Sequence, residues 1–120
     1  MYIIGNVVYG ISLTEEVGKA AEEWRPDGLG VLAKKGIVTT LYSGAVWHTV
    51  GYCGICLGRF DECDGDVLIK ADEGEMEELF RFIVTDEQRA KASEKIAKLP
   101  DEIKAVMPKV GIHFVFSTSC

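Results

Sequence analysis

The sequence lacks any long hydrophobic run. Nowhere in its 120 residues does an apolar stretch approach the roughly 20 residues that a membrane-spanning helix needs. The first residues also lack the basic region and the small-residue cleavage site of a secretory leader. We therefore expect a cytoplasmic protein that does not insert into membranes and whose cysteines stay reduced.

Positive charge is scarce as well. The chain has 13 lysines and arginines against 19 aspartates and glutamates, a net charge of −6. A surface of this sign repels phosphate backbones, so we expect no nonspecific binding of nucleic acid. The acidity fits simple solubility, or docking to a basic protein surface.

The sequence also lacks the common motifs of catalysis and phosphate binding. Neither G-x-x-x-x-G-K-[ST] nor G-x-G-x-x-G occurs, and G-x-S-x-G and H-E-x-x-H are missing too. Internal repeats, low-complexity tracts and linkers are absent from the sequence. Its length suits one compact domain, which we expect to span residues 1–120.

What the sequence does contain is an alternation of strand and helix patterns. Segments rich in β-branched and aromatic residues predict strands over 2–9, 36–43, 46–57, 66–71 and 110–119. Between the third and fourth of these, an Asp-Gly pair predicts a turn. In the last segment, alternation places Val110, Ile112, Phe114 and Phe116 on one face.

Capping signals predict the helices. Thr14 can cap a helix over 15–24, whose apolar residues recur at helical spacing. Thr85 opens a capping box, and good helix formers then continue to Lys98. A brief helix is expected over 101–107, between two prolines.

Two segments are ambiguous. Residues 29–35 fit a short strand or a loop, and residues 75–84 fit either a helix or a strand. We favour a strand from Leu79 onward, because aromatic and β-branched residues dominate there. The expected fold is α+β, with a mixed or antiparallel sheet of five to six strands and two to three helices on one face.

Three of the four cysteines lie in one glycine-rich segment, residues 51–66. Cys53, Cys56 and Cys63 have the spacing C-x2-C-x6-C, and His48 would complete a Cys3His zinc site. Against zinc, a second ligand pair is missing, and side chains at 53 and 56 point to opposite faces of an extended strand. A thiol-dependent enzyme built on the same residues is a further alternative.

Free cysteines are also common as small buried residues. In an extended strand Cys53, Ile55 and Leu57 share one face, which is typical of a core. The other face carries little bulk and consists of Tyr52, Gly54, Cys56 and Gly58. Such a face permits close approach of a crossing strand, a subunit or a ligand.

Aromatic residues and arginines near this segment complete the candidate site. Aromatic and imidazole rings can stack on a flat ligand such as a nucleobase, and arginine can bind phosphate or carboxylate. These candidate residues are Tyr42, Trp47, His48, Arg59 and Arg81, in addition to the four of the sparse face.

The segments AVWHTVGYCGICLGRFDEC (45–63) and PKVGIHFVFSTS (108–119) resemble uncharacterised small proteins carried by bacteriophages and prophages. The resemblance implies a compact accessory factor that occupies a host protein or sequesters a small molecule.

We therefore expect a non-catalytic binding protein, a homo-oligomer without a cofactor, that binds a host protein or sequesters a nucleotide-like signalling ligand. One alternative is a zinc-binding or thiol-dependent small enzyme using His48, Cys53, Cys56 and Cys63. The other is a structural component of a virion or of its assembly.

Overall fold

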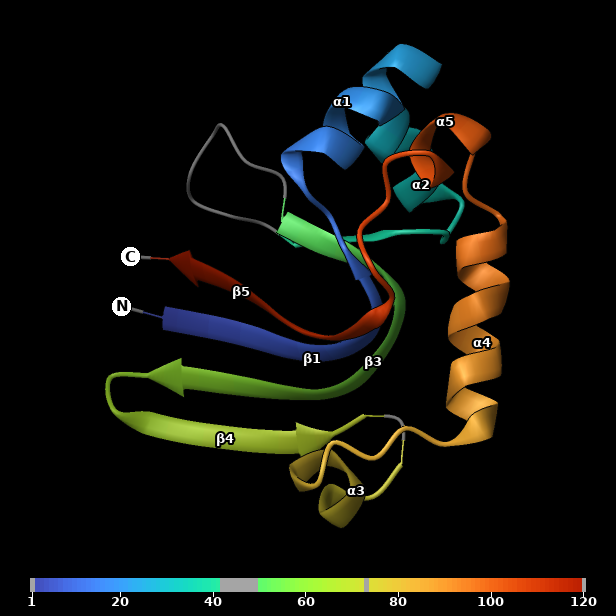
Figure 1. Cartoon of the computed structure of the whole chain (residues 1–120). Coiled ribbons are helices and arrows are strands. Elements are labelled where there is room, and N and C mark those ends of the chain that lie inside the picture. Colours follow the sequence, from blue (N-terminus) through green and yellow to red (C-terminus); the bar gives the residue numbers. More distant parts are fainter. Residues whose placement is uncertain (1, 42–49, 73, 120) are drawn as a thin grey trace.

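One antiparallel sheet of five strands organises the fold (Figure 1). The structure is a computed structural model, and it describes residues 2–41, 50–72 and 74–119. The strand order is β2-β3-β1-β5, and β4 pairs with the second half of β3. The strands are β1 (Tyr2–Ser12), β2 (Thr39–Leu41), β3 (Val50–Cys63), β4 (Asp66–Ala71) and β5 (Gly111–Ser119).

Helices occupy the connections between strands. They are α1 (Glu15–Trp24), α2 (Gly28–Lys34), α3 (Met76–Phe80), α4 (Asp86–Ala97) and α5 (Asp101–Lys104). The predicted α+β class is confirmed, and the sheet is antiparallel. Among the described residues no helix has the length and apolarity needed to cross a bilayer.

The predicted caps form as expected. The Thr14 hydroxyl accepts a hydrogen bond from the Val17 amide at 3.2 Å, at the start of α1. The Thr85 hydroxyl accepts from the Gln88 amide at 3.2 Å, and the Thr85 amide donates to the Gln88 side-chain oxygen at 2.8 Å. Each bond satisfies an amide that the first helical turn leaves without a partner.

Both ambiguous segments turn out to be helical. Residues 29–35 were expected as strand or loop, but α2 begins at Gly28 and ends at Lys34. The strand predicted from Leu79 is wrong, because α3 continues to Phe80. A capping box starts α3, in which the Glu75 amide donates to the Glu78 carboxylate at 3.1 Å. This local bond outweighs the β propensity of the residues that follow.

The strand predicted over 46–57 begins, within the described residues, at Val50 and continues beyond its predicted end to Cys63. Tyr42, Trp47 and His48 lie outside the described residues.

All of the main helices pack on one face of the sheet, which we call the helical face. Ile11 of β1 and Cys53 of β3 are fully buried there against Val17 of α1, Leu32 of α2 and Ile103 of α5. These contacts make the largest buried cluster of the described chain. The amphipathic helices therefore supply most of the core, as expected for an α+β domain.

The helical face continues along β3 toward its second half. Ile55 and Leu57 pack there against Leu79 of α3 and Ala92 of α4. Facing away from the helices, on the opposite face of the sheet, Val8, Tyr52, Cys56 and Val115 form a smaller buried cluster. The first half of β3 is therefore buried on both faces.

A row of three glycines crosses the three longest strands of the sheet. Gly10 of β1 lies directly opposite Gly54 of β3 on one side and Gly111 of β5 on the other. The φ angles of Gly10 and Gly54 are 148° and 147°, values that residues with a Cβ rarely adopt. We call this row the glycine crease. At Gly10 and Gly54 a Cβ would overlap the backbone of the neighbouring strand.

A β-bulge interrupts the pairing of β1 with β3. Val8 lies opposite Cys56 while Val7 lies opposite Gly58, so Leu57 is an extra residue. Residues directly opposite one another share a face. Because Val7 packs on the helical face, the bulge turns Gly58 to that face as well.

Candidate functional site

The predicted sparse face of β3 is filled by the chain itself. Tyr52 and Cys56 are buried, at 7% and 8% exposure, against Val8 and Val115 on the opposite face of the sheet. At Gly54 the space that a Cβ would fill is taken by the backbone of β1. Close approach to the backbone, as predicted, is therefore found here, and the approaching group is a neighbouring strand.

Gly58 does not share the face of Tyr52 as the alternation predicted. The bulge turns it to the helical face, where a Cβ would lie 2.5 Å from the Leu79 side chain. Leu79 thus packs directly on the β3 backbone and fixes α3 against the sheet. The alternation prediction is wrong at this position because one extra residue reverses every later side chain.

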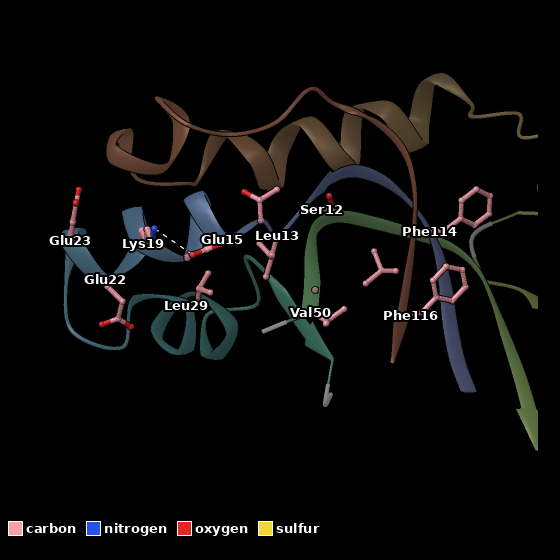
Figure 2. A pocket seen from close by; sticks show the side chains of 14 residues that line it. Ser12, Leu13, Glu15, Lys19, Glu22, Glu23, Leu29, Val50, Phe114 and Phe116 are labelled. Atoms are coloured by element: carbon pink, nitrogen blue, oxygen red, sulfur yellow. Dashed lines mark ion pairs between the residues drawn. The ribbon is translucent and has the colours of Figure 1, made fainter. Parts of the chain in front are cut away.

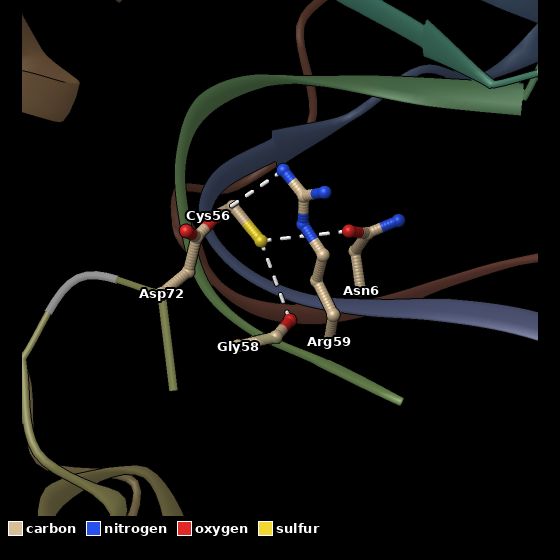
Figure 3. Close-up of polar contacts among 5 residues, drawn as sticks. All are labelled: Asn6, Cys56, Gly58, Arg59 and Asp72. Carbon is tan, nitrogen blue, oxygen red and sulfur yellow. Dashed lines mark hydrogen bonds and ion pairs between the residues drawn. The ribbon is translucent and has the colours of Figure 1, made fainter. Parts of the chain in front are cut away.

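Cys56 lies in a small polar cluster (Figure 3). Its thiol lies 3.5 Å from the side-chain oxygen of Asn6, which is itself buried, and 3.3 Å from the carbonyl oxygen of Gly58. The Arg59 guanidinium pairs with the Asp72 carboxylate at 3.5 Å beside it. The cluster therefore connects β1, β3 and the segment that follows β4.

The chemistry of the two buried thiols follows from their surroundings. Burial raises the pKa of Cys53 to about 11. Burial, followed by hydrogen bonding to Asp72, also raises the pKa of Cys56. Reactive cysteines instead have lowered pKa values in electropositive, partly exposed surroundings. Both thiols are thus poor nucleophiles at neutral pH, which gives no support to thiol chemistry at these two positions.

The three clustered cysteines do not converge. Cys53 packs on the helical face, Cys56 on the opposite face, and Cys63 is exposed at the end of β3. Within the described part of the chain no group of three potential metal ligands comes together. The predicted fourth ligand, His48, lies outside that part.

Both candidate arginines are ion-paired. Arg59 pairs with Asp72, and Arg81 pairs with Glu77 at 3.1 Å, one turn away on α3. Capture of a phosphate by either arginine has to break or share such a pair. Each pair is largely exposed, so its own contribution to stability is small.

An open hollow with a volume of about 760 Å³ lies beside α1 (Figure 2). Its floor includes apolar side chains of Leu13, Leu29 and Val50. Its rim carries Glu15, Glu22 and Glu23 with Lys19, which pairs with Glu15 at 3.4 Å. A rim of this charge disfavours an anionic ligand such as a nucleotide.

A second surface gathers all five phenylalanines of the chain, of which Phe114 and Phe116 also line the hollow beside α1. It lies on the helical face, because Phe114 lies opposite Val7, and Phe60 and Phe116 lie opposite Gly5. We call it the phenylalanine surface, and it consists of Phe60, Ile69, Phe80, Phe82, Phe114 and Phe116. Four of the five rings are exposed, with exposed fractions between 45% and 61%.

The rings of the phenylalanine surface are in mutual contact. Phe60 meets Phe116 edge to face at 5.4 Å, and Phe82 meets Phe114 at 5.8 Å. Phe114 and Phe116 stack with nearly parallel planes, 6.3 Å apart. Contacts of this kind order the rings in one arrangement, and rigid aromatic side chains lose little entropy on binding.

Two features shape this surface. A Cβ at Gly5 would lie 2.1 Å from the ring of Phe60, so that ring lies directly on the β1 backbone. Between α3 and the sheet is an apolar cavity of about 210 Å³, lined by Phe60, Phe80, Phe82 and Phe114 among others. The surface is therefore a shallow aromatic depression.

The sequence pattern did not single out this surface. It did place Phe114 and Phe116 on one face of the last strand, and this alternation is confirmed by their stacking. The other three phenylalanines lie in two further segments of the chain, and only the folded chain brings them together with Phe114 and Phe116.

Comparison with known proteins finds no matching family model, no similar curated protein and no similar solved structure.

Proposed function

We propose that the protein is a non-catalytic binding protein whose phenylalanine surface docks on a partner protein. The observation that carries the proposal is the collection of all five phenylalanines on one surface, four of them exposed. Large contiguous apolar patches are rare on monomers and are typical of interaction sites. Aromatic residues are also enriched among the residues that dominate binding energy.

Charge favours a protein partner over a nucleotide. The chain has a net charge of −6, and the first turn of α3 beside the surface carries Glu77 and Glu78. A nucleotide would meet two arginines that are already paired. A complementary partner has apolar side chains at the centre of its contact and lysines or arginines at the rim. This is the host-protein alternative of the two binding modes expected from the sequence.

A site-specific cross-link tests the proposal. A photoreactive phenylalanine analogue replaces Phe80, which is 61% exposed, in the producing cell. The matched control carries the analogue at Val106, which is 39% exposed and follows α5. We expect one protein adduct from position 80 and none from position 106.

The decisive measurement is the affinity of the chain for the purified protein identified in the adduct. We expect Phe80→Ser to weaken this affinity at least tenfold, which corresponds to the loss of an interface hot spot of more than about 1.4 kcal/mol. Val106→Ser should change it less than about twofold, since exposed residues outside an interface contribute little. Equal weakening by both variants, or adducts at both positions alike, would refute the proposal. A phosphorylated small molecule bound in native mass spectrometry would favour sequestration instead.

A further inference from the structure

β5 presents an unprotected edge. Among the described strands it pairs only with β1, which leaves the other side of its nine residues without a strand partner. Its sequence, GIHFVFSTS, contains no lysine, arginine, aspartate, glutamate or proline. Its pairing with β1 runs over nine residue pairs without a bulge. Charges, prolines, bulges and short length are the means by which proteins prevent edges from pairing.

The other two edges do carry such protection. Within the described part of the chain β2 covers only the three residues Thr39–Leu41. β4 is six residues long and includes the charged residues Asp66 and Lys70. The contrast singles out β5 as the edge that is compatible with another strand.

We propose that β5 pairs antiparallel with β5 of a second copy of this chain, so that the two sheets join across a two-fold axis. The strand is self-complementary, because an uncharged strand brings no like charges together when it meets itself. This matters for a chain with a net charge of −6, for which self-association elsewhere is opposed by repulsion. The inference goes beyond the proposed function and does not depend on it.

Symmetry fixes the register. All nine residues of both strands pair only when the axis passes through Val115, which places Phe114 opposite Phe116 of the partner subunit. Residues directly opposite share a face, so the stacked pair Phe114 and Phe116 meets its own copy on the helical face. Two phenylalanine surfaces thereby become one continuous surface.

The contact area predicts a weak dimer. A nine-residue strand is about 30 Å long and a sheet with its side chains is about 10 Å thick, which gives roughly 300 Å² per subunit. The exposed half of each of two phenylalanine rings adds roughly 200 Å². The sum is less than the ~800 Å² per partner of a stable complex, so we expect a dissociation constant in the micromolar range or above.

Sedimentation velocity of the full chain, without any partner protein, measures this equilibrium. We expect a monomer–dimer series with concentration, and a tighter dimer at higher salt because screening weakens the repulsion. Phe116→Lys should weaken the dimer at least tenfold, since it places charge at the contact. Val106→Lys is the matched control, because Val106 is similarly exposed (39% against 45% for Phe116) but follows α5, and it should change the constant less than about threefold.

A cysteine pair tests the register independently of stability. In a background with Cys63 and Cys120 replaced by serine, we expect oxidation of mixed Phe114→Cys and Phe116→Cys proteins to give a disulfide-linked heterodimer. Neither variant alone should cross-link, because identical positions are not opposite. A monomer at all concentrations up to about 1 mM, or a dimer indifferent to Phe116→Lys, would overturn the inference. Assembly into species that keep growing beyond the dimer would also overturn it, because a two-fold contact closes at two subunits. Partner binding by the phenylalanine surface is measured separately, so either idea can fail alone.

Discussion

Gly10 and Gly54 lie opposite one another in adjacent strands, and the backbone at each position fills the space that a side chain at the other would need. A Cβ on Gly54 would be 2.1 Å from the carbonyl oxygen of Tyr9. A Cβ on Gly10 would be 2.1 Å from the carbonyl oxygen of Cys53. The two strands are therefore in backbone contact at the crease, and only glycine fits at either position.

Substitution at the crease should be severely destabilising. We expect Gly54→Ala to lower the free energy of unfolding by about 3 kcal/mol or more, because strained backbone and backbone overlap both oppose it. Gly111→Ala is the control in the same row, since a Cβ there meets no atom within 4 Å. It should change stability by less than about 0.5 kcal/mol. Urea unfolding of both variants measures the difference, and equal effects would contradict this account.

Adjacent residues of α3 should behave oppositely. Leu79 is 8% exposed and packs on the β3 backbone, whereas Phe80 is 61% exposed. We expect Leu79→Ala to cost about 2–4 kcal/mol through loss of buried surface and a residual cavity. Phe80→Ala should cost less than about 1 kcal/mol. Thermal unfolding distinguishes them, and a large loss at Phe80 would mean that it belongs to the core rather than to a binding surface.

The cysteines should differ sharply in reactivity. Cys63 is exposed, while Cys53 and Cys56 are buried with raised pKa values. Because the thiolate is the reacting species, we expect Cys63 to react quickly with a thiol reagent at pH 7.4 and the two buried thiols only after unfolding. Native wild-type protein should therefore show one more fast-reacting thiol than Cys63→Ser. A fast phase that Cys53→Ala removes would contradict the burial of this residue.

Cys53 also predicts a dependence of stability on alkaline pH. Its folded-state pKa, about 11, lies above the ordinary value because burial favours the neutral thiol. The stability that the buried neutral thiol contributes is fully present below the unfolded-state pKa of about 8.5, and it is lost as the pH rises through the folded-state pKa. We expect the stability difference between wild type and Cys53→Ala to shrink by about 2–3 kcal/mol between pH 8 and pH 11. Urea unfolding across this range measures it, and a constant difference would contradict it.

Local signals in the sequence predicted much of the fold. The Thr14 and Thr85 caps sit at the expected helix starts, and the alternation of Phe114 with Phe116 appears in β5. Each of these patterns depends on residues within one or two turns, which a single sequence records. The class of the fold follows from them.

Errors arose where a distant contact or one extra residue decides the outcome. The helix α2 was not predicted, because its sequence contains Gly28 and Gly30. Gly28 is needed for close packing of α2 on α1, since a Cβ there would lie 2.1 Å from the Ala21 carbonyl oxygen. The bulge at Leu57 turns Gly58 to the opposite face of the sheet from the one predicted. The bulge depends on the register between β3 and β1, so the sequence of β3 alone does not reveal it.

The candidate site was the least predictable part. Sequence reasoning directed attention to the cysteine segment, whose small residues are explained by contacts inside the chain. The phenylalanines come from three separate segments, and their convergence depends on the placement of α3 over the sheet. A binding surface assembled in this way has no signature in any one segment.

Protection is unequal on the two sides of the bulge at Leu57. Before the bulge, β1 and β3 are buried beneath the helices, in the clusters around Cys53 and Ile55. Beyond it, β3 pairs with β4, whose residues are exposed almost throughout. In hydrogen–deuterium exchange we expect the first side to open only with global unfolding, and β4 with α3 to open locally at lower free energy. The binding surface would then reshape itself without disturbing the core that holds the chain together.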